Sequence, residues 1–151
     1  MADVKRMAGV EIKNLTQPLQ KGLGSVFSDI AKEILPSWDI SLAFVGAAKA
    51  RALNKKLRGK NYVPDVLSYV VGDKSAEIII CLSEARKQAP DYNVQPAIYN
   101  LFLFIHAALH IKGWVHGANM ERCERTLLKR YEKAYSNRSR YRNVPSKNGR
   151  S

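Results

Sequence analysis

Histidine and cysteine are both scarce in this chain. Its 151 residues include only three histidines, all between positions 106 and 116, and two cysteines, Cys81 and Cys123. The cysteines lack the C-x-x-C spacing of redox and metal motifs and are too few for a disulfide framework. We therefore expect both to be small buried apolar residues, and the sequence argues against a disulfide-stabilised scaffold.

Long apolar runs are also missing. No run reaches the about 18 residues of a membrane-spanning helix, and the segment Met1–Val10 lacks the apolar stretch of a secretory signal. We therefore expect a cytoplasmic protein that does not bind a membrane.

Acidic residues are few as well, with 13 Asp and Glu against 25 Lys and Arg and a net charge of +12. This excess favours a nucleic acid as partner, although a merely basic surface would give the same composition.

The apolar pattern predicts an α+β fold, with residues 1–136 as a single domain. Strands are expected at 9–15, 40–45, 65–71 and 76–82, and helices at 18–35, 47–57, 83–88, 97–111 and from 119. The first β-α-β unit favours parallel pairing, whereas the short turn between the last two strands forces an antiparallel pair. The prediction is a mixed four-stranded sheet packed by about five helices, with Ile40–Val45 as its central strand because it is apolar on both faces.

A basic tail is expected to follow the domain. The core face of the last helix fades after Ser136, and residues 137–151 contain five cationic residues and no acid: Arg138, Arg140, Arg142, Lys147 and Arg150. Such a segment is expected to be disordered by itself. It could fold or wrap on a polyanion, or it could be a solvated terminus, and the sequence does not separate these two interpretations.

The spacing of the three histidines suits a metal ion. His106 and His110 lie four residues apart on the predicted helix, so they share one face at about 6 Å along its axis. Gly113 can adopt the left-handed conformation that ends a helix, which allows His116 to return to the same place. Three imidazole ligands leave a fourth position for water, as in catalytic zinc sites, where that water can attack an ester. The helix is apolar all round, so we expect a metal site on a buried helix and the loop after it.

A histidine pair at helical spacing does not require a metal. Such a pair also occurs where the side chains only pack or hydrogen-bond, and it is the third histidine that favours an ion. A metalloprotease of the His-Glu-x-x-His type is excluded, because Ala107 stands where that motif has its glutamate base.

The histidine window resembles the YbeY family of bacterial endoribonucleases and ribosomal RNA maturation factors, whose signature runs His-Gly-x-Leu-His-Leu-x-Gly-x-Asp-His. The resemblance extends over about residues 40–130. The matching positions are His106, Leu109, His110, Gly113 and His116, and before and after them Leu53, Asn54, Arg58, residues 65–69, residues 77–81, Met120, Glu124, Leu127 and Leu128. The chain departs from the family at Pro64, Ala107 and Val115, where the family usually has Thr, Gly and Asp.

This resemblance implies a zinc-dependent single-strand endoribonuclease that matures the 3′ end of small-subunit ribosomal RNA and takes part in ribosome quality control. It implies one zinc ion per chain, held by His106, His110 and His116. Its implied partners are ribosomal RNA and the small ribosomal subunit with its proteins. Arg58 matches the family's functional arginine, and a guanidinium suits a phosphate because its fork binds two oxygens. Arg58 could instead pair with the dipole at its own helix end.

Val115 keeps a second class of function open. Without the family's carboxylate, the chain could be a non-catalytic ribosome-assembly factor that binds RNA and uses the metal for structure. The sequence also identifies no general base, although Glu77 and Glu84 are candidates for that role.

Overall fold

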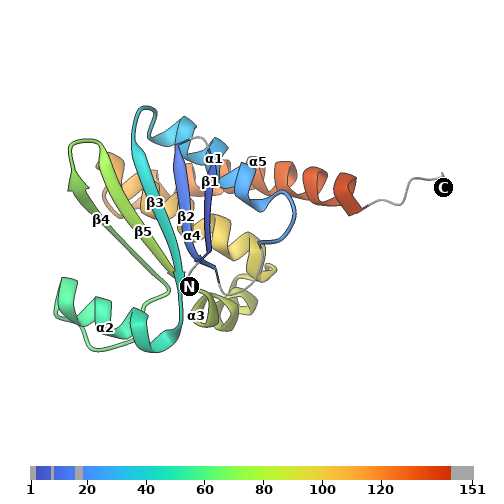
Figure 1. Ribbon diagram of the computed structural model, residues 1–151. Helices are drawn as coiled ribbons and strands as arrows, with labels where there is room; N and C mark the ends of the chain where they lie inside the picture. The colour runs from blue at the N-terminus through green and yellow to red at the C-terminus, as the bar shows by residue number, and fades with distance from the viewer. Residues whose placement is uncertain (1–2, 8, 16–18, 144–151) are drawn as a thin grey trace.

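The computed structural model describes residues 3–7, 9–15 and 19–143. These residues form a mixed sheet with helices packed around it (Figure 1). The elements in chain order are β1 (Asp3–Met7), β2 (Val10–Leu15), α1 (Leu23–Ile34), β3 (Asp39–Val45), α2 (Ala47–Arg58), β4 (Val66–Gly72), β5 (Ser75–Cys81), α3 (Leu82–Gln88), the 3-10 helix η1 (Ala89–Tyr92), α4 (Pro96–Lys112) and α5 (Ala118–Asn143).

The sheet has the strand order β1-β2-β3-β5-β4. The pairs β2/β3 and β3/β5 are parallel, and the outer pairs β1/β2 and β4/β5 are antiparallel. The predicted α+β class, the mixed sheet, the five α-helices and the central place of β3 are confirmed. The predicted count of four strands is wrong, because β1 adds a fifth. This edge strand is only five residues long and carries Lys5 and Arg6, so it lacks the apolar alternation that identifies a half-buried strand.

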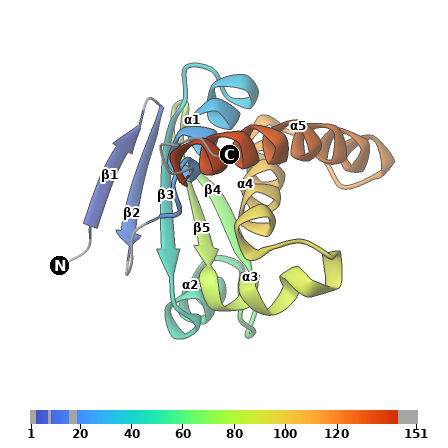
Figure 2. The same cartoon turned by 90° about the vertical axis from the view of Figure 1, so that its right-hand side faces the viewer.

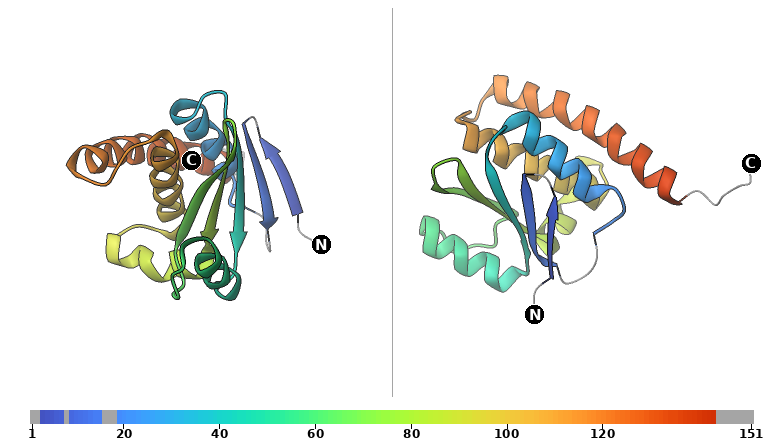
Figure 3. Two further views of the ribbon diagram at one scale, coloured as in Figure 1. Left: turned by 90° about the vertical axis from the view of Figure 1, so that its left-hand side faces the viewer. Right: turned by 45° about the horizontal axis from the view of Figure 1, so that its top comes forward.

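Helices α1, α4 and α5 lie on one face of the sheet, as Figure 2 shows from the side. The main core lies between them and the sheet, and α4 runs through its middle with Leu101, Phe104 and Ile105 fully buried. The opposite face is covered only in part, by α2 over a smaller apolar cluster. The two views of Figure 3 show the same arrangement, with α4 between the sheet and α5. Helix α4 therefore has neighbours on both sides, as its all-round apolar sequence predicts.

The helices are either too short or too polar to span a membrane. Within the described ranges, no single helix combines the length and hydropathy needed to cross a bilayer. The segments Leu82–Tyr92 and Pro96–Lys112 meet the criteria only as a pair, and that pair is bent by 101°.

Helix α1 begins later than its apolar pattern predicts. The expected start at Pro18 falls outside the described residues, and the helix begins at Leu23, after Gly22 in the left-handed conformation with φ +85°. Gly22 also allows a close approach, because a Cβ there would lie 2.9 Å from the Cβ of Arg138 on α5. The chain is thus turned into α1 at a point where α5 leaves no room for a side chain.

Helix α5 extends beyond the expected boundary at Ser136 and ends at Asn143. Contacts with α1 explain the extension: Tyr135 is buried, and the Arg138 guanidinium donates to Asp29 Oδ2 at 2.5 Å and to Ser25 Oγ at 2.8 Å. The expectation of disorder from residue 137 is therefore corrected for residues 137–143. The rest of the predicted tail, residues 144–151, lies outside the described residues.

Smaller differences concern helix starts. Helices α3 and α5 begin at Leu82 and Ala118, each one residue before the start expected from the sequence. The N-cap of α3 is Cys81, whose Sγ lies 3.4 Å from Ser83 Oγ. These small shifts do not alter the positions of the candidate site residues.

Candidate metal centre

The end of α4 brings the third histidine back to the first two. Gly113 has φ +114°, and its N–H donates to the carbonyl of His110 at 3.0 Å. The N–H of Trp114 donates to the carbonyl of Leu109 at 3.0 Å. These two bonds form a Schellman motif, in which a left-handed glycine reverses the chain after a helix. The predicted role of Gly113 is confirmed, and the reversal carries His116 alongside His110.

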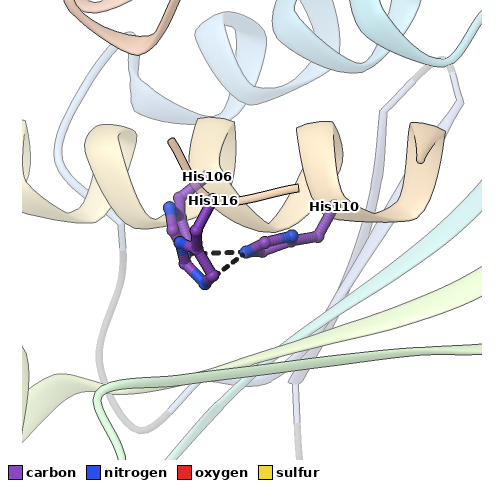
Figure 4. A group of neighbouring side chains, drawn as sticks. All are labelled: His106, His110 and His116. Carbon is purple, nitrogen blue, oxygen red and sulfur yellow. Dashed lines mark hydrogen bonds between the residues drawn. The ribbon is translucent and has the colours of Figure 1, made fainter. Parts of the chain in front are cut away.

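The three imidazoles converge on one point (Figure 4). His110 Nε2 lies 3.1 Å from His106 Nε2 and 3.1 Å from His116 Nε2. A ligand nitrogen from each ring lies within 4.8 Å of the other two. The three histidines therefore come together as the sequence predicts, and they could hold one metal ion.

Two acceptors set the tautomers of the helical histidines. His110 Nδ1 lies 3.1 Å from the carbonyl oxygen of Trp114, which can only accept, so the ring proton is on Nδ1. His106 Nδ1 donates in the same way to the carboxylate of Glu124 on α5. When both rings are neutral, each Nε2 therefore carries a lone pair and no proton. The two lone pairs then face each other at 3.1 Å, and a cation between them would make the contact favourable.

The spacing of the nitrogens fits a small divalent ion. Zinc binds imidazole nitrogen at about 2.0–2.1 Å in tetrahedral geometry, which corresponds to about 3.3 Å between ligand nitrogens. The two separations from His110 Nε2, each 3.1 Å, need a change of only a few tenths of an ångström, and all three ligand nitrogens lie within 4.8 Å of one another. A hydrogen bond from the distal Nδ1 to a carboxylate or carbonyl is also the usual support of a ligating histidine.

The site is half open to solvent. Burial lowers the pKa of His110, and the neighbouring histidines lower it further, against an opposing effect of the bond to Trp114. The imidazole is therefore neutral at pH 7, which is the form that binds metal. The His106 side chain is 22% exposed and His116 is exposed. The histidines are therefore accessible from solvent, although the helix that carries two of them is buried.

Arg58 lies at the same cavity as the histidines. The cavity has a volume of about 310 Å³ and is lined by Arg58, His106, Ala107, His110, His116 and residues 66–68 of β4. The Arg58 guanidinium donates to Asn54 Oδ1 and to the Tyr62 hydroxyl, each at 3.4 Å. Asn54 is fully buried and donates to the Tyr62 carbonyl at 3.0 Å, so it fixes both the loop and the arginine.

The two carboxylates that the sequence offers as general bases lie elsewhere. Glu77 faces the side of β5 opposite the main core, where it lines a different groove and accepts a hydrogen bond from Tyr69. Glu84 accepts from Gln88 at 2.8 Å and pairs with Lys87. Neither lines the histidine cavity, so neither is positioned for chemistry there.

Glu124 is the site residue that sequence reasoning left without a role. It is 6% exposed and contacts His106. A signal was present in the sequence, because Glu124 lies four residues after Met120 and three before Leu127, on the apolar face of α5. A carboxylate in such a position requires a buried partner.

The fold and the site together define a class: an α+β domain in which the core helix and the loop after it bring together three histidines that could hold a metal ion. A sequence model of the endoribonuclease YbeY family matches residues 6–138. The chain belongs to this family.

Individual relatives agree with the family match. The chain is similar to the endoribonuclease YbeY of Finegoldia magna, with 32% identity over 105 residues that cover 65% of this chain and 67% of that protein. It is also similar to the endoribonuclease YbeY of Spiroplasma citri, with 31% identity over 115 residues, 66% of this chain and 73% of that protein. The solution structure of TM1509 from Thermotoga maritima has the same fold, with a TM-score of 0.58 at 20% identity over 83% of this chain and 89% of that one.

Proposed function

We propose that this protein is a zinc-dependent single-strand endoribonuclease that acts on ribosomal RNA, in the maturation of the small-subunit 3′ end and in ribosome quality control. The observation that carries the proposal is the convergence of three imidazole Nε2 atoms in a cavity that also holds Arg58. The family's name supplies the endoribonuclease activity. Ribosomal RNA, the small subunit and its proteins are the proposed partners, in the cytoplasm, and the net charge of +12 supports an RNA partner.

His106, His110 and His116 are the proposed ligands of one ion. Imidazole nitrogens suit zinc, and two of the three are held in the correct tautomer by Glu124 and by the Trp114 carbonyl. When bound, zinc supplies an activated water at neutral pH and polarises a phosphoryl oxygen.

Arg58 is the proposed phosphate-binding residue. Its two partners, Asn54 and Tyr62, hold it through one nitrogen, Nη1. The other guanidinium N–H groups of Arg58 can still donate to a phosphate as negative charge develops on the phosphate oxygens. The alternative of a purely structural arginine at the end of α2 does not explain why Arg58 lines the histidine cavity.

The test is cleavage of ribosomal RNA by the metal-loaded protein beside its His110→Ala variant. We expect cleavage by the unmodified chain and much slower cleavage by the variant, because one ligand is removed. Equal cleavage by both proteins would identify a contaminating nuclease and remove support for this mechanism.

A second function is favoured by one observation. Val115, where the family has Asp, is 79% exposed next to His116 and offers no polar group to the site. A binding factor with a structural ion would have no need of that group. This function predicts that the chain binds small-subunit RNA without cutting it, and that removal of the metal unfolds the domain.

A further inference from the structure

Three aromatic rings form a platform next to the histidines. We call Tyr92, Tyr99 and Phe102 the aromatic platform. The ring centres are 5.1 Å apart for Tyr92 and Tyr99, 5.9 Å for Tyr92 and Phe102, and 5.7 Å for Tyr99 and Phe102, with tilts of 30–38°. The Phe102 ring lies 6.0 Å from that of His106, one helical turn further along α4. The platform thus leads directly to the candidate metal centre.

The platform is rigid at its base and open at its outer ring. Tyr99 is 2% exposed, and its hydroxyl donates to Asp65 Oδ2 at 2.9 Å. Phe102 is half-buried, whereas Tyr92 is 55% exposed. An exposed aromatic ring supported by a fixed neighbour offers a flat face at little entropic cost when a ligand stacks on it.

A second cavity joins this platform to the site. It has a volume of about 530 Å³, and its lining includes the three platform rings together with His106 and His116. Those two histidines also line the cavity that holds Arg58. The two cavities therefore meet at the histidines, with a guanidinium on one side and aromatic rings on the other.

The charges favour a base rather than a phosphate on the aromatic side. Glu121 and Glu124 line this cavity, and their carboxylates would repel a phosphate group. Carboxylates accept hydrogen bonds from the amino groups of bases, and every base has a face that can stack on an aromatic ring. Arg125, which also lines the cavity, supplies a cation for the sugar-phosphate backbone at the rim.

We propose that the aromatic platform is a nucleobase-binding subsite, in which a base next to the scissile phosphate of single-stranded RNA stacks on Tyr92. This rests on the proposed function, because the phosphate on the histidine side defines which base reaches the platform. A base must be unpaired to stack there, so the subsite selects single strands.

The experiment measures binding and stacking on a single-stranded oligonucleotide that is 2′-O-methylated to resist cleavage. One base at a time is replaced by 2-aminopurine, whose fluorescence falls when it stacks. With the metal-loaded full chain we expect quenching at one position or two adjacent positions. Tyr92→Ala should abolish that quenching and weaken binding about 5- to 150-fold, the range for loss of one stacked base.

Two further variants make the result specific. Tyr92→Phe keeps the ring and should keep both quenching and affinity. Val71→Ala removes an apolar side chain of similar exposure, 52%, from the groove on the other side of the sheet, and should change neither. Because Tyr92 is largely exposed, circular dichroism should show all variants folded.

The outcomes separate this proposal from the proposed function. Unchanged affinity and quenching in Tyr92→Ala, or binding by the unmodified chain with no quenching at any position, would refute the base subsite while leaving the nuclease intact. Quenching that depends on Tyr92 in a protein that cuts no RNA would support the subsite and count against the nuclease.

Discussion

The Glu124 carboxylate on α5 accepts a hydrogen bond from Nδ1 of His106 on α4. Two helices thus meet at one imidazole, and the ring is held in one tautomer with its Nε2 toward the other histidines. Since Glu124 is almost fully buried, water does not replace it easily when it is removed. In the proposed metal site, Glu124 would act on the ion through His106, as a positioning residue.

Loss of Glu124 should weaken metal binding. We expect the metal affinity of Glu124→Ala to fall about 10- to 100-fold, the usual effect of removing the partner of a ligating histidine. Glu124→Gln should lose less, because its amide oxygen still accepts a hydrogen bond. Competition with a chromophoric chelator measures the affinity. Glu132→Ala, an exposed change on the same helix, is the control. Equal affinities for Glu124→Ala and the control would show that His106 needs no carboxylate.

Each histidine should be required for the ion. Elemental analysis should find about one zinc per chain, falling sharply in His106→Ala, His110→Ala and His116→Ala, since three ligands are needed and the chain has no other histidine. Val115→Ala, a change beside His116 that removes no ligand, should retain the ion. A full ion in any one histidine variant would remove that histidine from the ligand set.

Removal of the metal should leave the domain folded. Neither apolar cluster includes a histidine, so the core does not depend on the ion. We expect unchanged far-ultraviolet circular dichroism in a chelator and a Tm about 5–10 °C lower than with free metal at about 100 times its Kd. Loss of secondary structure at 25 °C would instead favour the binding factor with a structural ion.

Arg58 should affect cleavage and not metal content. We expect Arg58→Ala to cut RNA about 10²- to 10³-fold more slowly, the usual cost of one charge-stabilising donor, at unchanged zinc content. Lys56→Ala removes an exposed cation from the same helix and should have little effect. Single-turnover cleavage and elemental analysis give the two measurements. Slow cleavage in both variants would point to general charge, and full activity in Arg58→Ala would make the arginine structural.

The contact between α5 and α1 should fail in alkali. Burial, aided by a hydrogen bond to Glu33, raises the pKa of Tyr131 to about 12. An unfolded tyrosine has a pKa of about 10, so between pH 10 and 12 the unfolded chain loses a proton that the folded chain keeps. The stabilisation is complete below pH 10 and is lost as pH rises through this window. Urea unfolding should show a shallower loss in Tyr131→Phe, and an identical pH profile would contradict this assignment.

The sequence predicts those features that depend on local pattern. The sequence was sufficient to predict helix α4, the left-handed Gly113 and the convergence of the three histidines. Each depends on a pattern among neighbours along the chain: a run of apolar residues, a glycine, and a four-residue spacing. The antiparallel pair β4/β5 followed from its short turn. Strand β3 followed from its apolar residues on both faces.

Features that depend on contacts between distant parts of the chain could not be predicted from the sequence. Strand β1 forms because β2 offers it an edge, and the last turns of α5 form because Asp29 and Ser25 on α1 receive Arg138. The partnership of Glu124 with His106 joins residues 18 positions apart on different helices. Each is a tertiary interaction, and no propensity of the segment alone predicts it.

The close approach at Gly22 couples the position of one end of α5 to the position of Glu124 near its other end. Arg138, pressed against Gly22, is 14 residues from Glu124, which is about 21 Å along a rigid helix at about 1.5 Å per residue. A side chain at position 22 would push that end of α5 outward and tilt the end that carries Glu124. A genetic screen for poor metal retention should therefore recover substitutions of Gly22, a residue that lines neither cavity next to the histidines.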